Sequence, residues 1–251
     1  MILKKDWEFN VLQVYNYQKP GKLDSYFNFI KNNHEKIEGD ICEIGVYRGS
    51  SLVATALFLK EIGSDKKVWG FDNFSGFPGY HKYDSLSFFK TLYQQGDISK
   101  EHYDQHLLNI QHKEILTGDV LNPSNISTSS DFSGTSRLLL EKKIDYFELD
   151  NIEIIDGNFE DTMKSGALKG LKFMASLMDC DLYESHHTAL PFVWGKMPVG
   201  GYKFLDEYYS LKFPGARIAI NKFFLNKLNK PEMDTHKETD FERWSVKKIS
   251  E

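Results

Sequence analysis

A strand, a glycine-containing loop, a helix and a second strand follow one another between residues 40 and 72. The strand-like run Asp40–Ile44 leads into the loop Gly45–Gly49, and an apolar helical run covers Ser50–Ile62. Lys67–Asp72 is a second strand that ends on an acidic residue. Parallel strands need a crossover connection, which is usually a helix. This segment therefore predicts a βαβ unit within a parallel sheet.

The same alternation of strands and helices resumes in the second half of the chain. Helices are expected at 184–195 and 216–228, and further strands at Ile152–Asp156, Leu171–Met178, Tyr202–Leu205 and Phe241–Ile249. Leu171–Met178 is continuously apolar, as a strand buried on both faces should be. We expect a Rossmann-like α/β fold, with a mostly parallel central sheet and helices on both faces.

The 251 residues suit one such domain, which we expect to span residues 1–251. Residues 1–38 are aromatic-rich and are expected to form an N-terminal arm, with a helix at 23–30. Residues 80–145 are polar, with helical patches at 85–94 and 100–109. We interpret this stretch as an insertion or lid. The arm and the insertion are also candidate contacts for a homo-oligomer.

Composition excludes several partners. The formal net charge is −5 and lysines are scattered, which argues against nucleic acid. The longest strongly apolar run, Leu52–Leu59, is too short to span a bilayer, so no membrane partner is expected. The first ten residues lack the apolar stretch of a signal peptide. A cytoplasmic protein with two buried free thiols, Cys42 and Cys180, is expected.

The loop after the first strand favours one nucleoside cofactor. Its pattern is E-x-G-x-x-x-G from Glu43 to Gly49, without the middle glycine that brings backbone against a pyrophosphate. The carboxylate of Glu43 would repel a phosphate. S-adenosylmethionine carries a sulfonium and an ammonium and no phosphate, so an acid there attracts it. Asp72 can accept from both ribose hydroxyls, although an acid there is shared by nucleoside-binding folds generally.

Two segments are candidates for the adenine-binding site. Asn158 could hydrogen-bond the adenine amino group while Phe159 packs on the ring. Ile115–Val120 has a similar pattern, an apolar run followed by Gly and Asp. The first segment is preferred because the next strand follows it at a normal helix length. The predicted cofactor-binding residues are Glu43, Gly45, Tyr47, Gly49, Ser50, Asp72, Ser75, Gly157, Asn158, Phe159 and Asp179.

Acidic residues follow the fourth and fifth predicted strands. Neighbouring parallel strands bring their carboxyl ends together, so Asp179, Asp206 and Glu207 are expected to converge. Three converging carboxylates repel one another unless a cation intervenes, and hard oxygen ligands suit Mg²⁺. Such a metal can lower the pKa of a bound hydroxyl, with Asp179 or Asp181 as general base. The alternative for these acids is helix capping and pairing with lysines.

At this point the sequence resembles the macrocin O-methyltransferase family. The residues that carry the resemblance are GDICEIGVYRGSS, VWGFDNFSGFP, GNFEDT, DCDLYES and GGYKFLDEY followed by PGARIAINKF, in the family's order over about residues 39–79 and 152–224. The family includes antibiotic-sugar O-methyltransferases of the novobiocin, mycinamicin and calicheamicin pathways.

The resemblance implies a class I methyltransferase fold, Mg²⁺ dependence and methylation of a sugar hydroxyl. Glu43, Gly45, Asp72 and Asn158 would bind cofactor, and Asp179, Asp206 and Glu207 would hold the metal. Many members have aspartate at the position of Glu207, so its ligation is the least secure. The expected acceptor is a sugar or a glycosylated or nucleotide-linked small molecule. The alternatives are an NAD-dependent nucleotide-sugar oxidoreductase of Rossmann type and a non-catalytic cofactor-binding protein.

Overall fold

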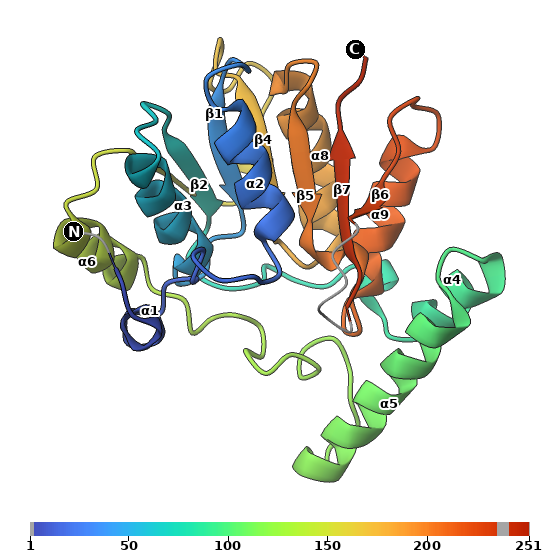
Figure 1. Cartoon of the computed structure of the whole chain (residues 1–251). Helices are drawn as coiled ribbons and strands as arrows, with labels where there is room; N and C mark the ends of the chain where they lie inside the picture. Colours follow the sequence, from blue (N-terminus) through green and yellow to red (C-terminus); the bar gives the residue numbers. More distant parts are fainter. Residues whose placement is uncertain (1–2, 235–240, 251) are drawn as a thin grey trace.

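The computed structural model of the chain describes residues 3–234 and 241–250. Within these ranges a central sheet carries helices on both faces (Figure 1). Its strand order is β3-β2-β1-β4-β5-β7-β6. The strands are β1 (Asp40–Ile44), β2 (Val68–Asp72), β3 (Ile152–Asp156), β4 (Phe173–Met178), β5 (Tyr202–Leu205), β6 (Glu232–Asp234) and β7 (Arg243–Lys247).

Strands β1 to β5 are parallel, and β7 runs antiparallel to both β5 and β6. β1 pairs with β2 on one side and with β4 on the other, so the direction of winding reverses beside β1. Ligands of open α/β sheets bind in the crevice outside the carboxyl ends of the strands at such a reversal. The predicted Rossmann-like class is confirmed, and its binding crevice is expected beside β1.

Two hydrophobic clusters hold the helices on the sheet. One contains residues of α2 (Asp24–Asn33) and α3 (Ser50–Glu61), and the other contains residues of α8 (Tyr183–Lys196) and α9 (Pro214–Phe224). Adjacent residues of β1 divide between them, since side chains alternate faces along a strand. The other helices are α1 (Asp6–Leu12), α4 (Phe88–Gln95), α5 (Lys100–Thr117), α6 (Arg137–Phe147) and α7 (Phe159–Thr162), with 3₁₀ turns η1 (Lys82–Asp84) and η2 (Asp206–Tyr208).

The segment predicted as an insertion, residues 80–145, contains two different parts. Helices α4 and α5 extend away from the sheet (Figure 1). Helix α6 instead packs in the core through Leu140 and Phe147, as the crossover helix that precedes β3. Ile115–Val120, the alternative adenine segment, covers the C-terminal end of α5 and the residues after it. It follows no strand, and the Ile115 side chain is 73% exposed.

The three-residue strand β6 was not predicted, because its sequence EMD carries no strand-like apolar pattern. Cys42 and Cys180 are both buried and unpaired. Among the described residues, no helix combines the length and apolar character needed to cross a bilayer.

Candidate functional site

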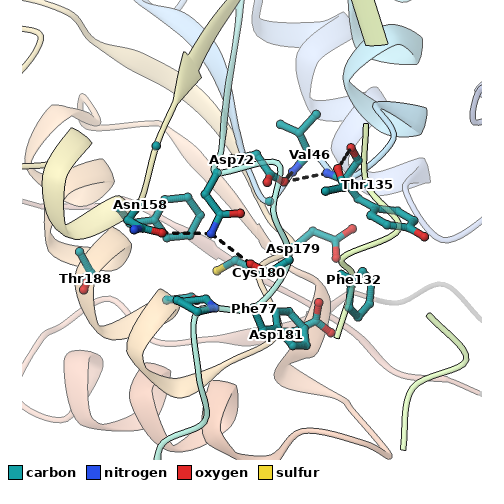
Figure 2. Close-up of a pocket in the computed structure, with 18 of the residues that line it drawn as sticks. Val46, Asp72, Phe77, Phe132, Thr135, Asn158, Asp179, Cys180, Asp181 and Thr188 are labelled. Atoms are coloured by element: carbon teal, nitrogen blue, oxygen red, sulfur yellow. Dashed lines mark hydrogen bonds between the residues drawn. The ribbon is translucent and has the colours of Figure 1, made fainter. Parts of the chain in front are cut away.

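A pocket of about 290 Å³ lies at the carboxyl ends of the parallel strands (Figure 2). The segments that follow β1, β2, β3 and β4 form most of its wall. Phe132 and Thr135, from the irregular stretch before α6, also line it. Among the residues predicted to bind cofactor or to act in catalysis, the lining includes Gly45, Tyr47, Ser50, Asp72, Gly157, Asn158, Phe159, Asp179 and Asp181.

Gly45 brings the loop after β1 against the loop after β4. Its φ is +88°, a left-handed conformation that favours glycine. A Cβ added at this position would lie 1.9 Å from the carbonyl oxygen of Asp179. No other residue fits this approach without moving one of the two loops. Gly45 therefore sets the distance between the predicted cofactor loop and the predicted catalytic loop.

Glu43, Gly49 and Ser75 were predicted to bind cofactor but are not among the residues that line the pocket. The side chain of Glu43 is fully buried and accepts a 2.8 Å hydrogen bond from the Ser51 hydroxyl of α3. Burial raises the pKa of Glu43 well above its usual value. The predicted direct attraction of a cation by this carboxylate does not fit its position, because the strand alternation turns it towards α3.

Gly49 has a packing role. It precedes α3 with a φ of +72°, and a Cβ there would lie 2.4 Å from Cδ1 of Leu140 on α6. The second glycine of the motif thus permits α6 to approach the cofactor loop. Gly49 was predicted to contact the cofactor, but its place in the E-x-G-x-x-x-G motif is explained by this packing against α6.

Asp72 organises the loop as well as facing the pocket. Its Oδ2 accepts from the backbone amides of Val46 and Tyr47 at 2.7 and 2.8 Å, and its Oδ1 accepts from the amide of Phe74 at 2.7 Å. A carboxylate oxygen has about two acceptor sites, so Oδ1 keeps capacity for a further donor. The two ribose hydroxyls that were expected to donate to Asp72 would therefore have to share its carboxylate with the loop amides.

The turn after β3 faces the loop after β2 across the pocket. Asn73 donates from Nδ2 to the Asn158 side-chain oxygen at 3.0 Å and to the Gly76 carbonyl at 3.0 Å (Figure 2). The Gly157 amide bonds the Asp72 carbonyl at 3.0 Å. These bonds link the two segments predicted to hold ribose and adenine. Asn73 lines the pocket and was missed, because adjacent Asp72 carried the recognised pattern.

Two phenylalanines of the lining were also missed. Phe77 and Phe132 come from separate loops, and their ring centroids lie 4.9 Å apart. The Phe132 ring also packs edge-on against the Tyr47 ring, with the two ring centroids 5.2 Å apart. The irregular stretch around residue 132 has no local pattern that indicates such a contact. Only the folded chain brings these aromatic rings to the predicted cofactor loop.

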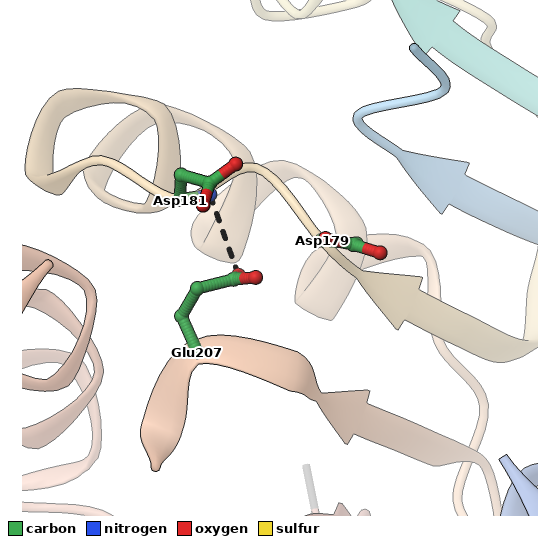
Figure 3. A group of neighbouring side chains, drawn as sticks. All are labelled: Asp179, Asp181 and Glu207. Atoms are coloured by element: carbon green, nitrogen blue, oxygen red, sulfur yellow. Dashed lines mark hydrogen bonds between the residues drawn. The ribbon is translucent and has the colours of Figure 1, made fainter. Parts of the chain in front are cut away.

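An acidic cluster adjoins the pocket. One carboxylate oxygen from each of Asp179, Asp181 and Glu207 lies within 4.8 Å of the other two (Figure 3). The backbone amide of Asp181 donates to Glu207 Oε2 at 3.3 Å. Asp181 has a φ of +55°, in the left-handed region. The chain thus turns sharply after β4 and presents two aspartates beside the glutamate that follows β5.

The predicted metal set differs from this cluster by one residue. Asp179 and Glu207 belong to both sets, whereas Asp181 takes the place expected for Asp206. The Asp206 carboxylate instead pairs with the Lys22 ammonium, at 3.2 Å to Oδ1 and 3.1 Å to Oδ2. Lys22 was missed, because it lies 184 residues from Asp206 in an arm that carries no recognised motif.

The carboxyl groups of the cluster act on one another electrostatically. Burial and the neighbouring Asp206 raise the pKa of Asp179, while burial and Asp179 raise the pKa of Asp181 to about 7. Burial, reinforced by the three neighbouring aspartates, raises the pKa of Glu207 well above its usual value. Several carboxylates held this close favour protons or a cation. The hard oxygen donors, presented by two loops, fit Mg²⁺.

Two further residues, one beside the cluster and one in the pocket lining, have clear structural partners. His186 is fully buried, its Nδ1 lies 3.0 Å from the Leu182 carbonyl, and burial lowers the pKa of its ring to about 4. It is therefore a neutral structural histidine at neutral pH. Arg48 lines the pocket, but its Nε donates to the Gly134 carbonyl at 3.0 Å.

The mostly parallel sheet, with β7 antiparallel and helices on both faces, is the fold of the Rossmann-like class I methyltransferases, and the structure of the O-methyltransferase NovP superposes on this chain with a TM-score of 0.59 at 19% identity, covering 90% of this chain and 80% of that one. The chain belongs to the macrocin O-methyltransferase family (TylF), whose model matches residues 21–113 and 125–238. The resemblance stated from the sequence motifs is confirmed.

The chain is also similar to named O-methyltransferases and to a solved methyltransferase structure. The chain is 23% identical over 220 residues to demethyldecarbamoylnovobiocin O-methyltransferase of Streptomyces niveus, covering 87% of this chain and 70% of the relative. It is 23% identical over 190 residues to mycinamicin III 3''-O-methyltransferase of Micromonospora griseorubida, covering 74% and 61%. The crystal structure of CalS11, a calicheamicin methyltransferase, superposes with a TM-score of 0.62 at 15% identity, covering 97% and 80%.

Proposed function

We propose that this protein transfers the methyl group of S-adenosylmethionine to a hydroxyl of a sugar, in a glycosylated or nucleotide-linked small molecule, with Mg²⁺ in the acidic cluster. One observation carries the proposal: Asp179 and Asp181 belong both to the pocket lining and to the cluster. A methyl donor in the pocket and a hydroxyl at the cluster would therefore meet at these two residues. One solved relative is named a TDP-rhamnose 3'-O-methyltransferase, which supports a sugar hydroxyl as the acceptor class.

The pocket offers each part of the cofactor a suitable neighbour. Phe159 and Asn158 suit the adenine, and the remaining acceptor site of Asp72 suits a ribose hydroxyl. The loop that contains Gly45 and Tyr47 would hold the methionine portion beside Asp179. A cationic sulfonium gains from a carboxylate there, which replaces the attraction first assigned to Glu43.

The cluster supplies the groups needed to activate a hydroxyl. Asp179 and Glu207 would hold the metal, with Asp206 as the further ligand that the family resemblance implies. Bound Mg²⁺ supplies a Lewis acid that lowers the pKa of a coordinated hydroxyl. Asp181 lines the pocket beside this site and would accept the hydroxyl proton, as Asp179 could in its place. The aromatic rings of Phe77 and Phe132 would exclude water.

The two alternatives receive less support. An NAD-dependent oxidoreductase needs a loop that cradles a pyrophosphate, and this loop lacks the middle glycine. A non-catalytic binding protein gives no reason for three carboxylates held together beside the pocket. A cytoplasmic location and self-association stay predictions.

Methyl transfer from labelled S-adenosylmethionine to a panel of glycosides and nucleotide sugars tests the proposal. We expect transfer that EDTA stops and added Mg²⁺ restores. Asp181→Asn is expected to lower the rate by about 10²–10⁴-fold, the usual contribution of a general base. Asparagine tolerates the left-handed backbone of this position, so the variant should fold normally. Transfer that is unchanged by EDTA would remove the metal from the mechanism.

A further inference from the structure

A lysine from the N-terminal arm reaches the acidic cluster. The ammonium of Lys22 lies 3.1 Å from Asp206 Oδ2 and 3.8 Å from Asp179 Oδ2. Its side chain is 37% exposed, whereas that of Asp206 is 17% exposed. This cation therefore bridges a carboxylate of the cluster and the adjacent carboxylate that was expected to ligate metal. Nothing in the proposed methyl transfer uses it.

The backbone around Lys22 is fixed by contacts that do not involve its ammonium. The Gly21 amide donates to Asp24 Oδ1 at 2.8 Å, and the Leu23 amide donates to the Tyr15 hydroxyl at 3.1 Å. The side chain of Leu23 is fully buried. The arm thus presents Lys22 from a rigid turn, and the flexible lysine stem alone can move the ammonium to or from Asp206.

The Lys22 ammonium balances negative charge in and beside the acidic cluster. Without a metal ion, four carboxyl groups lie in and beside the cluster, and ionised carboxylates this close repel one another. Burial opposes the charged form of Lys22, but Asp206 and Asp179 outweigh it and raise its pKa. Burial likewise opposes ionisation of Asp206, but Lys22 outweighs it and lowers the pKa of Asp206. The pair is therefore ionised at neutral pH.

We propose that Lys22 is an internal counter-ion that competes with the divalent cation, holding Asp206 until the metal displaces it. The inference rests on the metal site proposed above. Asp206 has two states in this scheme: paired with Lys22 when the site lacks metal, and released to the metal when the cation binds. Lys22 thereby weakens cation binding and neutralises the empty cluster.

Calorimetric titration of Mn²⁺ into the full-length protein tests this role without any turnover. Lys22→Met should tighten Mn²⁺ binding by about ten-fold, because one nearby positive charge is removed and Asp206 is released. Lys22→Arg, which keeps the charge, should remain close to wild type. Lys212→Met is the matched control for charge alone, since Lys212 also acts electrostatically on Asp179 and Asp181 without a salt bridge to either. Its effect should be clearly smaller.

Asp206→Asn identifies the ligand that Lys22 holds. In the wild-type background this substitution should change Mn²⁺ affinity little, because the loss of a ligand is offset by the loss of the ion pair that the metal has to displace. In the Lys22→Met background it should abolish most of the gain. An affinity that is unchanged or weaker in Lys22→Met overturns the inference, as does an equal gain in Lys212→Met.

Binding of S-adenosylhomocysteine to the same preparations separates this inference from the proposed function and verifies folding. If wild type binds both S-adenosylhomocysteine and Mn²⁺ and Lys22→Met matches it, the counter-ion role is wrong and the methyltransferase proposal stands. If neither protein binds Mn²⁺ but both bind S-adenosylhomocysteine, the metal site and the counter-ion role are both wrong. If S-adenosylhomocysteine does not bind wild type, the proposed function itself fails.

Discussion

At the scale of single residues, the site depends on a few positions with two tasks each. Asp72 holds the loop amides and faces the pocket, and Asp179 joins the pocket to the acidic cluster. Gly45 was predicted to bind cofactor, and in the structure its close approach to the carbonyl of Asp179 requires a glycine. Residue types alone could not reveal that Glu43 faces α3, because a carboxylate near the end of a strand suits either position.

Gly45→Ala should disrupt the site more than the same change at an uncrowded glycine. The added Cβ meets the Asp179 carbonyl at 1.9 Å, so the two loops must separate. We expect S-adenosylhomocysteine affinity to fall at least about ten-fold and stability to fall by more than about 1 kcal/mol. Calorimetric titration and thermal unfolding measure the two effects.

Gly63→Ala is the matched control. Gly63 has a φ of +69°, but a Cβ there would meet nothing within 4 Å. It should therefore show only the backbone cost, about 1 kcal/mol, with ligand affinity unchanged. Equal affinity losses in both variants would show that the contact with Asp179 is unimportant.

At the scale of elements, strands of the central sheet were the most predictable parts. The bounds of β1, β3 and β5 match the expected ranges, because each is a short apolar run that ends at a polar or glycine-rich turn. Helix α5 was predicted to end at 109 but continues to Thr117, since its exposed turns carry little apolar periodicity. Helix α6 was placed in the insertion because its sequence follows a low-complexity stretch.

Helix α5 is docked by two histidines onto the segment that follows η2. His102 Nε2 lies 2.8 Å from the Ser210 carbonyl, and His106 Nδ1 lies 2.9 Å from the Leu211 carbonyl. Burial lowers the pKa of His102 to about 4, with the nearby charge of Arg217 acting in the same direction. Burial also lowers the pKa of His106.

Acid should therefore loosen α5. An unfolded histidine titrates near 6.5, so between about pH 6.5 and 4 the unfolded state binds more protons than folded His102. The stability that neutral His102 provides is complete above about pH 6.5 and is lost as the pH falls towards 4. The loss is at most about 3 kcal/mol. Hydrogen exchange of α5 amides and thermal unfolding across this range measure it.

His102→Gln should flatten this pH dependence. His112→Gln is the control, because His112 is exposed on the same helix and should leave the profile of the wild-type protein intact. A wild-type profile that is flat between pH 6.5 and 4 would contradict the role of His102.

At the scale of the whole molecule, the sheet brings together groups from distant parts of the chain. The order of β1 relative to β2 and β4 places the crevice, whereas the alternation of strands and helices in the sequence predicted only a mostly parallel sheet with helices on both faces. The contributions of Phe132 and Lys22 could not be predicted, because their segments have no periodic pattern and reach the site only through tertiary packing. Two of the three residues of the acidic cluster, Asp179 and Glu207, were expected to converge, whereas Asp181 was expected only as a general base.

Calorimetric titration of the purified protein with S-adenosylhomocysteine and, separately, with NAD⁺ tests the central claim most directly. The ligand pair discriminates between a loop that holds a nucleoside without phosphate and a loop that cradles a pyrophosphate. The account predicts micromolar binding of S-adenosylhomocysteine and no measurable heat with NAD⁺. Binding of NAD⁺ without binding of S-adenosylhomocysteine would contradict it.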